Sequence, residues 1–160
     1  MKKIILDVCC GGRMMWFNKK HPACLYVDKR SRARGFMKTR ENFEISPDLV
    51  ADFKKLPLKD KSFNLVVFDP PHTIRAGNGD DQGIIAQRYG RLMLSTWETE
   101  LAEGFKECWR VLKPAGVLIF KWNECDKKIN DLKHFFPAEP LFGSRPGSRT
   151  KTLWLCFMKF

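Results

Sequence analysis

The sequence predicts an α/β fold with a doubly wound, mostly parallel sheet, and three observations lead to this prediction. Apolar runs of four to seven residues, rich in β-branched and aromatic side chains, recur along the chain as buried strands do. More polar, helix-compatible stretches separate these runs. Four of the first five runs are followed directly by aspartate. Strands that alternate with helices form right-handed βαβ units, which bring the ends of parallel strands to one edge of a sheet.

Six strands are expected in chain order. They cover residues 3–6, 23–27, 48–51, 63–68, 117–122 and 153–158. The gaps of 21, 24 and 17 residues between the four aspartates are each long enough for one helical crossover. A loop-like stretch, 140–151, precedes the last strand, so we expect that strand to return antiparallel.

The strongest helical pattern covers residues 95–112, where apolar side chains recur at helical spacing on one face. These side chains are Trp97, Leu101, Phe105, Cys108, Trp109 and Leu112. Ser95 and Glu98 match a capping box at its start, and Pro-Ala-Gly at 114–116 ends it. We expect the apolar stripe to pack against the sheet.

The longest irregular stretch is 72–94, which contains four glycines. Loops of this length in a compact domain are usually functional or disordered. Because the stretch follows the fourth strand, we expect it to lie over the carboxyl edge of the sheet, where open α/β folds bind ligands.

Composition limits the class of protein. The chain carries 29 Lys and Arg against 18 Asp and Glu, a net charge of +11, with 44% hydrophobic residues among its 160. This balance excludes a disordered polyelectrolyte. The length fits one domain, 1–160, and no apolar run approaches the ~20 residues of a membrane helix. A polyanion is the expected partner of so basic a chain, with nucleic acid first.

The six cysteines predict neither a metal site nor a disulfide framework, because no pair has the C-x-x-C spacing of a zinc site. The start of the chain meets a charge, Asp7, too soon for a signal peptide. We therefore expect reduced thiols and a cytoplasmic protein.

The four aspartates at the strand ends, Asp7, Asp28, Asp52 and Asp69, are expected at the same edge of one sheet. The alternative for any one of them is that it caps the helix that follows. Four carboxylates in one cleft of a protein with a charge of +11 indicate a ligand instead.

The turn after the first strand indicates what kind of ligand this is. Cys9, Cys10 and Gly11 are small enough for a cofactor to approach the backbone closely. The dinucleotide pattern G-x-G-x-x-G is absent, and an acidic rim disfavours a pyrophosphate.

The acids after the second and third strands fit a nucleoside. Asp28 is placed to bind ribose hydroxyls, and Asp52 with Phe53 to hold and stack an adenine. A nucleoside with a positively charged centre fits better than NAD. S-adenosylmethionine is that molecule.

At this point the sequence resembles the class I S-adenosylmethionine-dependent methyltransferases, and among them the amino-methyltransferases that act on nucleic acids. Residues 7–12, Asp-Val-Cys-Cys-Gly-Gly, are similar to the family motif D-x-F-x-G-S-G, with Arg13 where a third glycine often stands. Residues 69–72, Asp-Pro-Pro-His, match the D-P-P-aromatic catalytic motif, with histidine in the aromatic place. Residues 108–116 resemble the family's turn from a helix into the fifth strand. The resemblance implies a Rossmann-like methyltransferase fold.

The resemblance also implies catalytic roles. The Asp69 carboxylate would accept one N–H of an exocyclic amine and the Pro70 carbonyl the other, which aims the nitrogen lone pair at the methyl group. Pro70 and Pro71 hold that carbonyl rigidly because their φ angles are fixed. His72 would stack on the target base or accept a proton.

A target base must be flipped out or already single-stranded. Two basic runs without acids, 29–40 and 143–160, are expected to meet its phosphates or to be merely solvated faces. The residues predicted to bind the substrate are Arg75, Trp122, Arg145 and Arg149, with core packing as an equal alternative for Trp122.

Three functions remain open at this stage. The first is methylation of N6 of adenine or N4 of cytosine in DNA or RNA. The second is methylation of a protein amide or a small molecule, and the third a non-catalytic nucleic-acid-binding subunit of the same fold. Target selectivity is expected from 72–94, the basic loops, a partner subunit or a homodimer.

Overall fold

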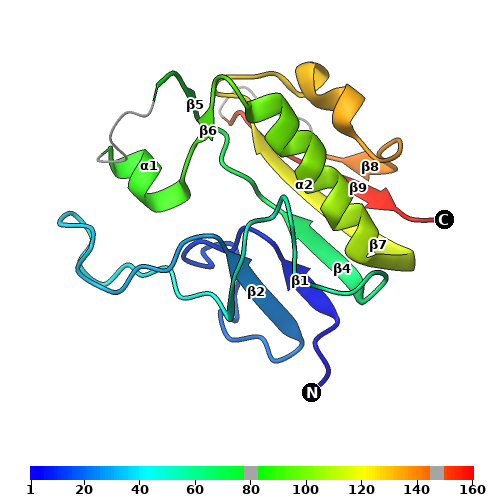
Figure 1. Cartoon of the computed structure of the whole chain (residues 1–160), viewed down its shortest axis with the longest axis horizontal. Coiled ribbons are helices and arrows are strands. Elements are labelled where there is room, and N and C mark those ends of the chain that lie inside the picture. The colour runs from blue at the N-terminus through cyan, green and yellow to red at the C-terminus, as the bar shows by residue number, and fades with distance from the viewer. Residues whose placement is uncertain (78–82, 145–149) are drawn as a thin grey trace.

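The computed structural model describes residues 1–77, 83–144 and 150–160. Its main sheet has seven strands in the order β3-β2-β1-β4-β7-β9-β8 (Figure 1). The strands are β1 Ile5–Asp7, β2 Cys24–Asp28, β3 Leu49–Val50, β4 Phe63–Phe68, β7 Leu112–Asn123, β8 Phe142–Gly143 and β9 Thr152–Met158. The first five strands in this sheet order are parallel, and β9 runs antiparallel to β7 and β8. The mostly parallel α/β fold with an antiparallel last strand is confirmed.

Helix α2, Trp97–Val111, covers one face of this sheet (Figure 1). Its predicted apolar stripe is buried against a core of aromatic rings, among them Phe68, Phe105 and Phe120. The predicted capping box is wrong: the helix begins after Thr96, which makes no side-chain cap. Instead the Thr96 hydroxyl lies 2.7 Å from the Glu100 carboxylate one turn later.

The expected helical crossovers are wrong, because none of the three crossovers between β1 and β4 contains an α-helix within the described residues. In the first crossover, Arg13 has a left-handed φ of 53°. Only eight residues, 14–21, then remain before Pro22, which is too few for a stable helix of several turns. This loop instead covers the sheet face locally, with Trp16 packed edge-on against Tyr26 at 5.2 Å.

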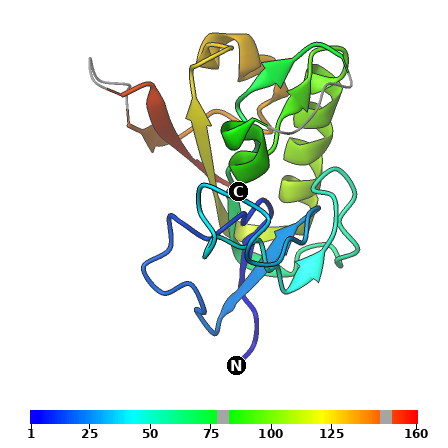
Figure 2. The same cartoon turned by 90° about the vertical axis from the view of Figure 1, so that its left-hand side faces the viewer.

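The second crossover forms a projecting hairpin that we call the arm, residues 29–46. Arg32 and Ile45 pair through two backbone hydrogen bonds of 2.9 Å, and Gly35 turns the chain with a φ of 86°. Figure 1 shows the arm extending away from the sheet, and Figure 2 shows the molecule from the side on which the arm projects.

The stretch 72–94 is more regular than expected. It contains a two-stranded parallel sheet of β5, Ile74–Arg75, and β6, Leu92–Met93, with helix α1, Ile84–Tyr89, between them. A 3-10 helix, η1, Ile129–Phe135, follows β7. In the described part of the chain, no helix is long and apolar enough to cross a membrane.

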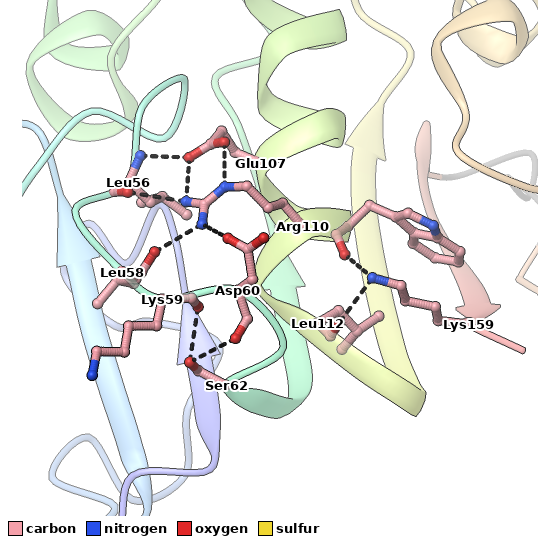
Figure 3. A network of polar contacts seen from close by, with 10 residues as sticks. Leu56, Leu58, Lys59, Asp60, Ser62, Glu107, Arg110, Leu112 and Lys159 are labelled. Carbon is pink, nitrogen blue, oxygen red and sulfur yellow. Dashed lines mark hydrogen bonds and ion pairs between the residues drawn. The ribbon is translucent and has the colours of Figure 1, made fainter.

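A polar network ties the turn before β4 to the end of α2 (Figure 3). The Arg110 guanidinium donates to the carbonyl oxygens of Leu56 at 3.0 Å and Leu58 at 2.8 Å. The same group pairs with Asp60 and Glu107 at 2.6 and 2.7 Å. Charged hydrogen bonds to otherwise unpaired carbonyls stabilise this turn, and so the entry of the chain into β4.

Candidate active site

One pocket lies at the carboxyl ends of the parallel strands. Its wall is formed by residues 8–12 after β1, the root of the arm, residues 69–72 after β4, residues 88–90 of α1 and its end, and Lys121 on β7. It holds about 820 Å³ including its open mouth.

The glycine turn after β1 packs closely against the arm. A Cβ atom on Gly12 would lie 2.3 Å from Cε2 of Phe43, so no larger residue fits there without displacing the ring. Gly11 has a φ of 47°, and its N–H donates to Asp28 Oδ2 at 2.9 Å. The turn and the arm therefore form one continuous wall of the pocket.

Arg13 takes the left-handed conformation that a third glycine would adopt at no steric cost, whereas another L-residue loses roughly 1–2 kcal/mol there. Its side chain offsets this cost. The guanidinium donates to the carbonyl oxygens of Lys19 at 2.7 Å and Ser46 at 2.5 Å, and to Asp48 at 3.0 Å. It also lies 3.9 Å above the Tyr26 ring. The departure from the family motif is thus accommodated by contacts to Ser46, the last residue of the arm, and to Lys19 and Asp48 outside it.

Asp28 is buried in the pocket wall and is already engaged on both oxygens. One oxygen accepts from the Gly11 N–H, and the other accepts from the backbone N–H of Arg30 at 2.9 Å and its Nε at 3.2 Å. Arg30 continues to the carbonyl oxygen of Gln87 in α1 at 3.2 Å. Asp28 therefore joins the glycine turn, the arm and α1 at one point.

The other two acids of the predicted row do not line the pocket. Asp7 is fully buried beneath it, where its carboxylate accepts from the Trp16 indole at 2.7 Å. Burial raises the pKa of Asp7 to about 7, and the charges of Asp69 and Asp28 add to the effect. Asp52 caps its own turn, accepting from the Lys54 N–H at 3.0 Å. Only Asp28 and Asp69 of the four acids face the pocket.

The two carboxylate oxygens of Asp69 differ in their hydrogen bonding. Oδ2 accepts a 2.6 Å hydrogen bond from Lys121 Nζ, a charged pair that is mostly shielded from water. Oδ1 is buried and has no hydrogen-bond partner among the described residues. A buried acceptor without a donor is costly, and such exceptions often mark functional sites. Asp69 thus presents one oriented, open acceptor beside Pro70 and Pro71 in the pocket wall.

His72 lies on the other side of that open oxygen, with its Nε2 3.7 Å from Asp69 Oδ1. Burial lowers the pKa of His72, the charge of Asp69 opposes this shift, and Lys121 adds to it. The ring is therefore neutral near pH 7, and its Nδ1 is a second buried atom without a partner in the described structure. The edge of the ring packs at 5.4 Å against Trp122, which fixes its plane.

Cys9 and Cys10 line the pocket as neutral thiols. Burial raises the pKa of both thiols well above the ordinary value, and the charges of Asp28 and Asp7 raise them further. They therefore act as small, apolar wall residues and not as nucleophiles.

The structure brings most of the predicted site residues together. Those that line the pocket are Cys9, Cys10, Gly11, Asp28, Phe53, Asp69, Pro70, Pro71 and His72. Trp122 instead belongs to the core, where it is fully buried and its indole donates to the Lys127 carbonyl oxygen at 2.9 Å. Arg75 also lies away from the pocket wall and pairs with Asp126 at 2.8 Å. Arg145 and Arg149 fall outside the described residues.

Several residues of the wall were not among the predicted site residues, and the most informative of them are Lys121, Phe43 and Arg88. The sequence does contain an indication for Lys121, because a lysine inside an apolar strand is expected to pair with an acid nearby. Phe43 and Arg88 had no local signal, since the folding of the arm and of 72–94 brings them to the pocket. No group of three or more metal-ligating side chains occurs in the part of the chain that the structure describes.

No protein-family model matches the chain, and no curated protein sequence matches it. Solved structures do. The PH0226 protein from Pyrococcus horikoshii OT3 is 18% identical, with a TM-score of 0.63 over 98% of this chain and 81% of that one. A SAM-dependent methyltransferase from Methanosarcina mazei is 12% identical, with a TM-score of 0.55 over 100% and 94% of the two chains. The antibiotic-resistance methyltransferase Kmr is 17% identical, with a TM-score of 0.54 over 99% and 87%.

Identities this low establish a shared fold and nothing finer. The chain has the Rossmann-like fold of the class I S-adenosylmethionine-dependent methyltransferases. The pocket described above lies at the carboxyl edge of the sheet, where open α/β folds bind their ligands.

Proposed function

We propose that this chain is an S-adenosylmethionine-dependent methyltransferase that methylates an exocyclic amine of a nucleic-acid base. The observation that carries the proposal is the open, buried acceptor Oδ1 of Asp69, held in the same pocket as the glycine turn and Asp28. An acceptor with no donor in the protein is complementary to a ligand N–H.

The pocket residues fit the cofactor. Cys9, Cys10 and Gly11 are small, so the cofactor could lie close to the backbone of their turn. Phe53 offers an aromatic surface for an adenine. Asp28 is the acid available to ribose hydroxyls, which would share its oxygens with Arg30. Bound S-adenosylmethionine supplies an electrophilic methyl group on a sulfonium. Asp52 has no part in this site, and Asp7 supports it from below.

The chain's own contribution is placement of a weak nucleophile. Asp69 Oδ1 would accept one N–H of the target amine and the Pro70 carbonyl the other, so that the lone pair of the nitrogen points into the pocket. The nitrogen gains one bond to carbon and must lose one proton. Neutral His72, 3.7 Å from Asp69 Oδ1, is placed to receive that proton or to pack on the base.

Charge supports a nucleic acid over a protein or a small molecule as the substrate. The net charge is +11, and Lys29 and Arg88 lie in the wall of the pocket in addition to Arg30 and Lys121, whose charges are paired with Asp28 and Asp69. Phosphates attract such a surface, whereas a neutral amide gains nothing from it.

The test is transfer of a labelled methyl group to DNA, RNA and protein offered side by side, after calorimetry has measured S-adenosylmethionine binding. Label in nucleic acid, at a base amine, is the expected result. Label only in protein would contradict the substrate, and absence of cofactor binding would contradict the enzyme.

The variant Asp69→Ala should abolish transfer while its cofactor affinity stays close to that of the wild type. Asp52→Ala is the matched control, because it removes a strand-end carboxylate that lies outside the pocket. Equal activity of the two variants would show that Asp69 does not position the amine.

A further inference from the structure

The arm carries a charge that the rest of its structure does not require. It contains six basic residues and two acids, so its net charge is 6 − 2 = +4 over residues 29–46. The basic residues are Lys29, Arg30, Arg32, Arg34, Lys38 and Arg40. A crossover between parallel strands needs length and an apolar side to pack, but it needs no charge of one sign.

The arm holds these basic residues on a backbone that is stabilised by packing and hydrogen bonds within the arm. Met37 and Ile45 are buried within it, and the rings of Phe36 and Phe43 lie 5.9 Å apart. Its tip is closed by a 2.8 Å hydrogen bond from the Gly35 N–H to the Glu41 carbonyl oxygen. The backbone that carries the basic side chains is therefore fixed by its own contacts.

Few of the charges are neutralised. Arg30 is bound to Asp28, and Arg34 makes an exposed 3.4 Å pair with Glu44. Within the described residues, Lys29, Lys38 and Arg40 have no carboxylate within 4.0 Å. Lys38 and Arg40 lie near the tip and are exposed to solvent.

The root of the arm forms part of the pocket. Lys29, Arg30 and Phe43 line it, and Arg30 contacts α1 through the Gln87 carbonyl oxygen at 3.2 Å. Figure 1 shows the arm and α1 projecting on the same side of the sheet. A chain of phosphates attached to a base in the pocket would leave between these two elements and meet the basic residues of the arm.

We propose that the arm binds the phosphate backbone of a single-stranded nucleic acid and guides the target base to Asp69. This inference rests on the proposed function and adds the surface that holds the substrate. Electrostatic grooves that track a single strand act in this way in other folds.

The test compares two double variants that each remove two positive charges. Lys38→Gln/Arg40→Gln removes them from the tip of the arm. Lys59→Gln/Lys106→Gln removes two exposed charges from the turn before β4 and from α2, outside the pocket wall. The probe is a labelled single-stranded RNA of about 16 nucleotides, the upper end of the site sizes of single-strand-binding folds. Its affinity is measured against salt concentration, and the same preparations are titrated with S-adenosylmethionine.

The slope of log affinity against log salt concentration is negative, and the arm variant should make it shallower by about 1.4, or ~0.7 for each of two lost phosphate contacts. If the electrostatic contribution vanishes near 1 M salt, this equals about 25-fold weaker binding at about 0.1 M. The control variant should keep the wild-type slope, and both should keep the wild-type affinity for the cofactor.

Equal slopes for the two variants would overturn the inference about the arm, because only overall charge would then matter, while leaving the proposed methyltransferase function standing. A wild-type protein that binds the cofactor but neither RNA nor the corresponding DNA would overturn both the arm and the nucleic-acid substrate. Retained cofactor affinity of the arm variant excludes misfolding as the cause of a lost slope.

Discussion

The pairing of Lys121 with Asp69 is expected to support both the stability and the activity of the protein, and Lys121→Met tests it. The pair is 2.6 Å long, and the two side chains are 22% and 15% exposed. Removal of one partner of a fully buried pair costs about 3–5 kcal/mol. Because some water reaches this pair, we expect about 2 kcal/mol, within the range of a hydrogen bond to a charged group. Methionine keeps an apolar stem of similar length but loses the ammonium group, which also lies 5.7 Å from the centroid of the Trp154 ring.

The free energy of unfolding is measured by urea denaturation, and the turnover number by labelled-methyl transfer. If the contact also orients the open oxygen, a loss of about 2 kcal/mol in the transition state corresponds to roughly 30-fold slower turnover. Lys113→Met is the control on the same strand, because among the described residues Lys113 Nζ donates to the neutral Asn64 side chain at 2.8 Å and pairs with no carboxylate. We expect the control to unfold within about 0.5 kcal/mol of the wild type.

A double-mutant cycle with Asp69→Asn isolates the pair from other effects of each substitution. In the double variant neither side chain is charged, whereas Lys121→Met alone leaves the Asp69 carboxylate without its partner, so Lys121→Met should destabilise the Asp69→Asn protein less than it destabilises the wild type. Wild-type stability and wild-type turnover of Lys121→Met would together refute the reasoning.

Three further predictions concern packing and pH. Gly12→Ala should weaken cofactor binding at least tenfold in a calorimetric titration, because its Cβ would lie 2.3 Å from a ring carbon of Phe43; unchanged affinity would contradict the close contact. Asp7→Asn should be more stable than the wild type above pH 7 and equal to it near pH 4 in urea titrations. The reason is that burial raises the pKa of Asp7 to about 7 in the folded protein, so folding favours the protonated carboxyl. The free energy of unfolding is therefore highest below the ordinary pKa of 3.8 and decreases as the pH rises through 7. A gain that does not depend on pH would argue against a buried titrating carboxyl. Gly104→Ala places a Cβ 2.6 Å from one core ring and 2.8 Å from another. It should lower the free energy of unfolding by about 1–2 kcal/mol, whereas Gly83→Ala, with nothing within 4 Å, should not.

Much of the sheet was predictable because its strands are buried apolar runs, whose signal is local. The predicted strand 63–68 coincides with β4, Phe63–Phe68, and the aromatic stripe of 95–112 is the buried face of α2. The helix expected in the first crossover was wrong, because there Arg13 has a left-handed conformation and is held by Ser46 and Asp48, more than thirty residues away. Contacts of that range leave no periodic pattern in the sequence.

The site was predictable in part for the same reason. The strand-end position of Asp69 follows from a local pattern, but whether an acid faces the pocket depends on its neighbours in space. Asp7 is taken up by the Trp16 indole beneath the pocket. Lys121 reaches Asp69 because the register pairs Phe68 with Phe120, so that the next residues along β4 and β7 are neighbours. Register between strands distant in the chain is the information that one sequence does not contain.

The anchoring of the glycine turn to the arm has a consequence for how the proposed cofactor and nucleic acid would bind. Gly12 packs on Phe43, and Arg13 donates a hydrogen bond to the Ser46 carbonyl oxygen. The glycine turn is therefore coupled to residues 43–46 of the arm. If a cofactor in the pocket reduces the motion of the turn, and through these contacts the motion of the arm, then a strand bound to the arm would in return raise the affinity of the pocket by the same factor. Cofactor and nucleic acid should therefore bind cooperatively, with neither strictly first, and the ternary complex should hold each more tightly than either binary complex does.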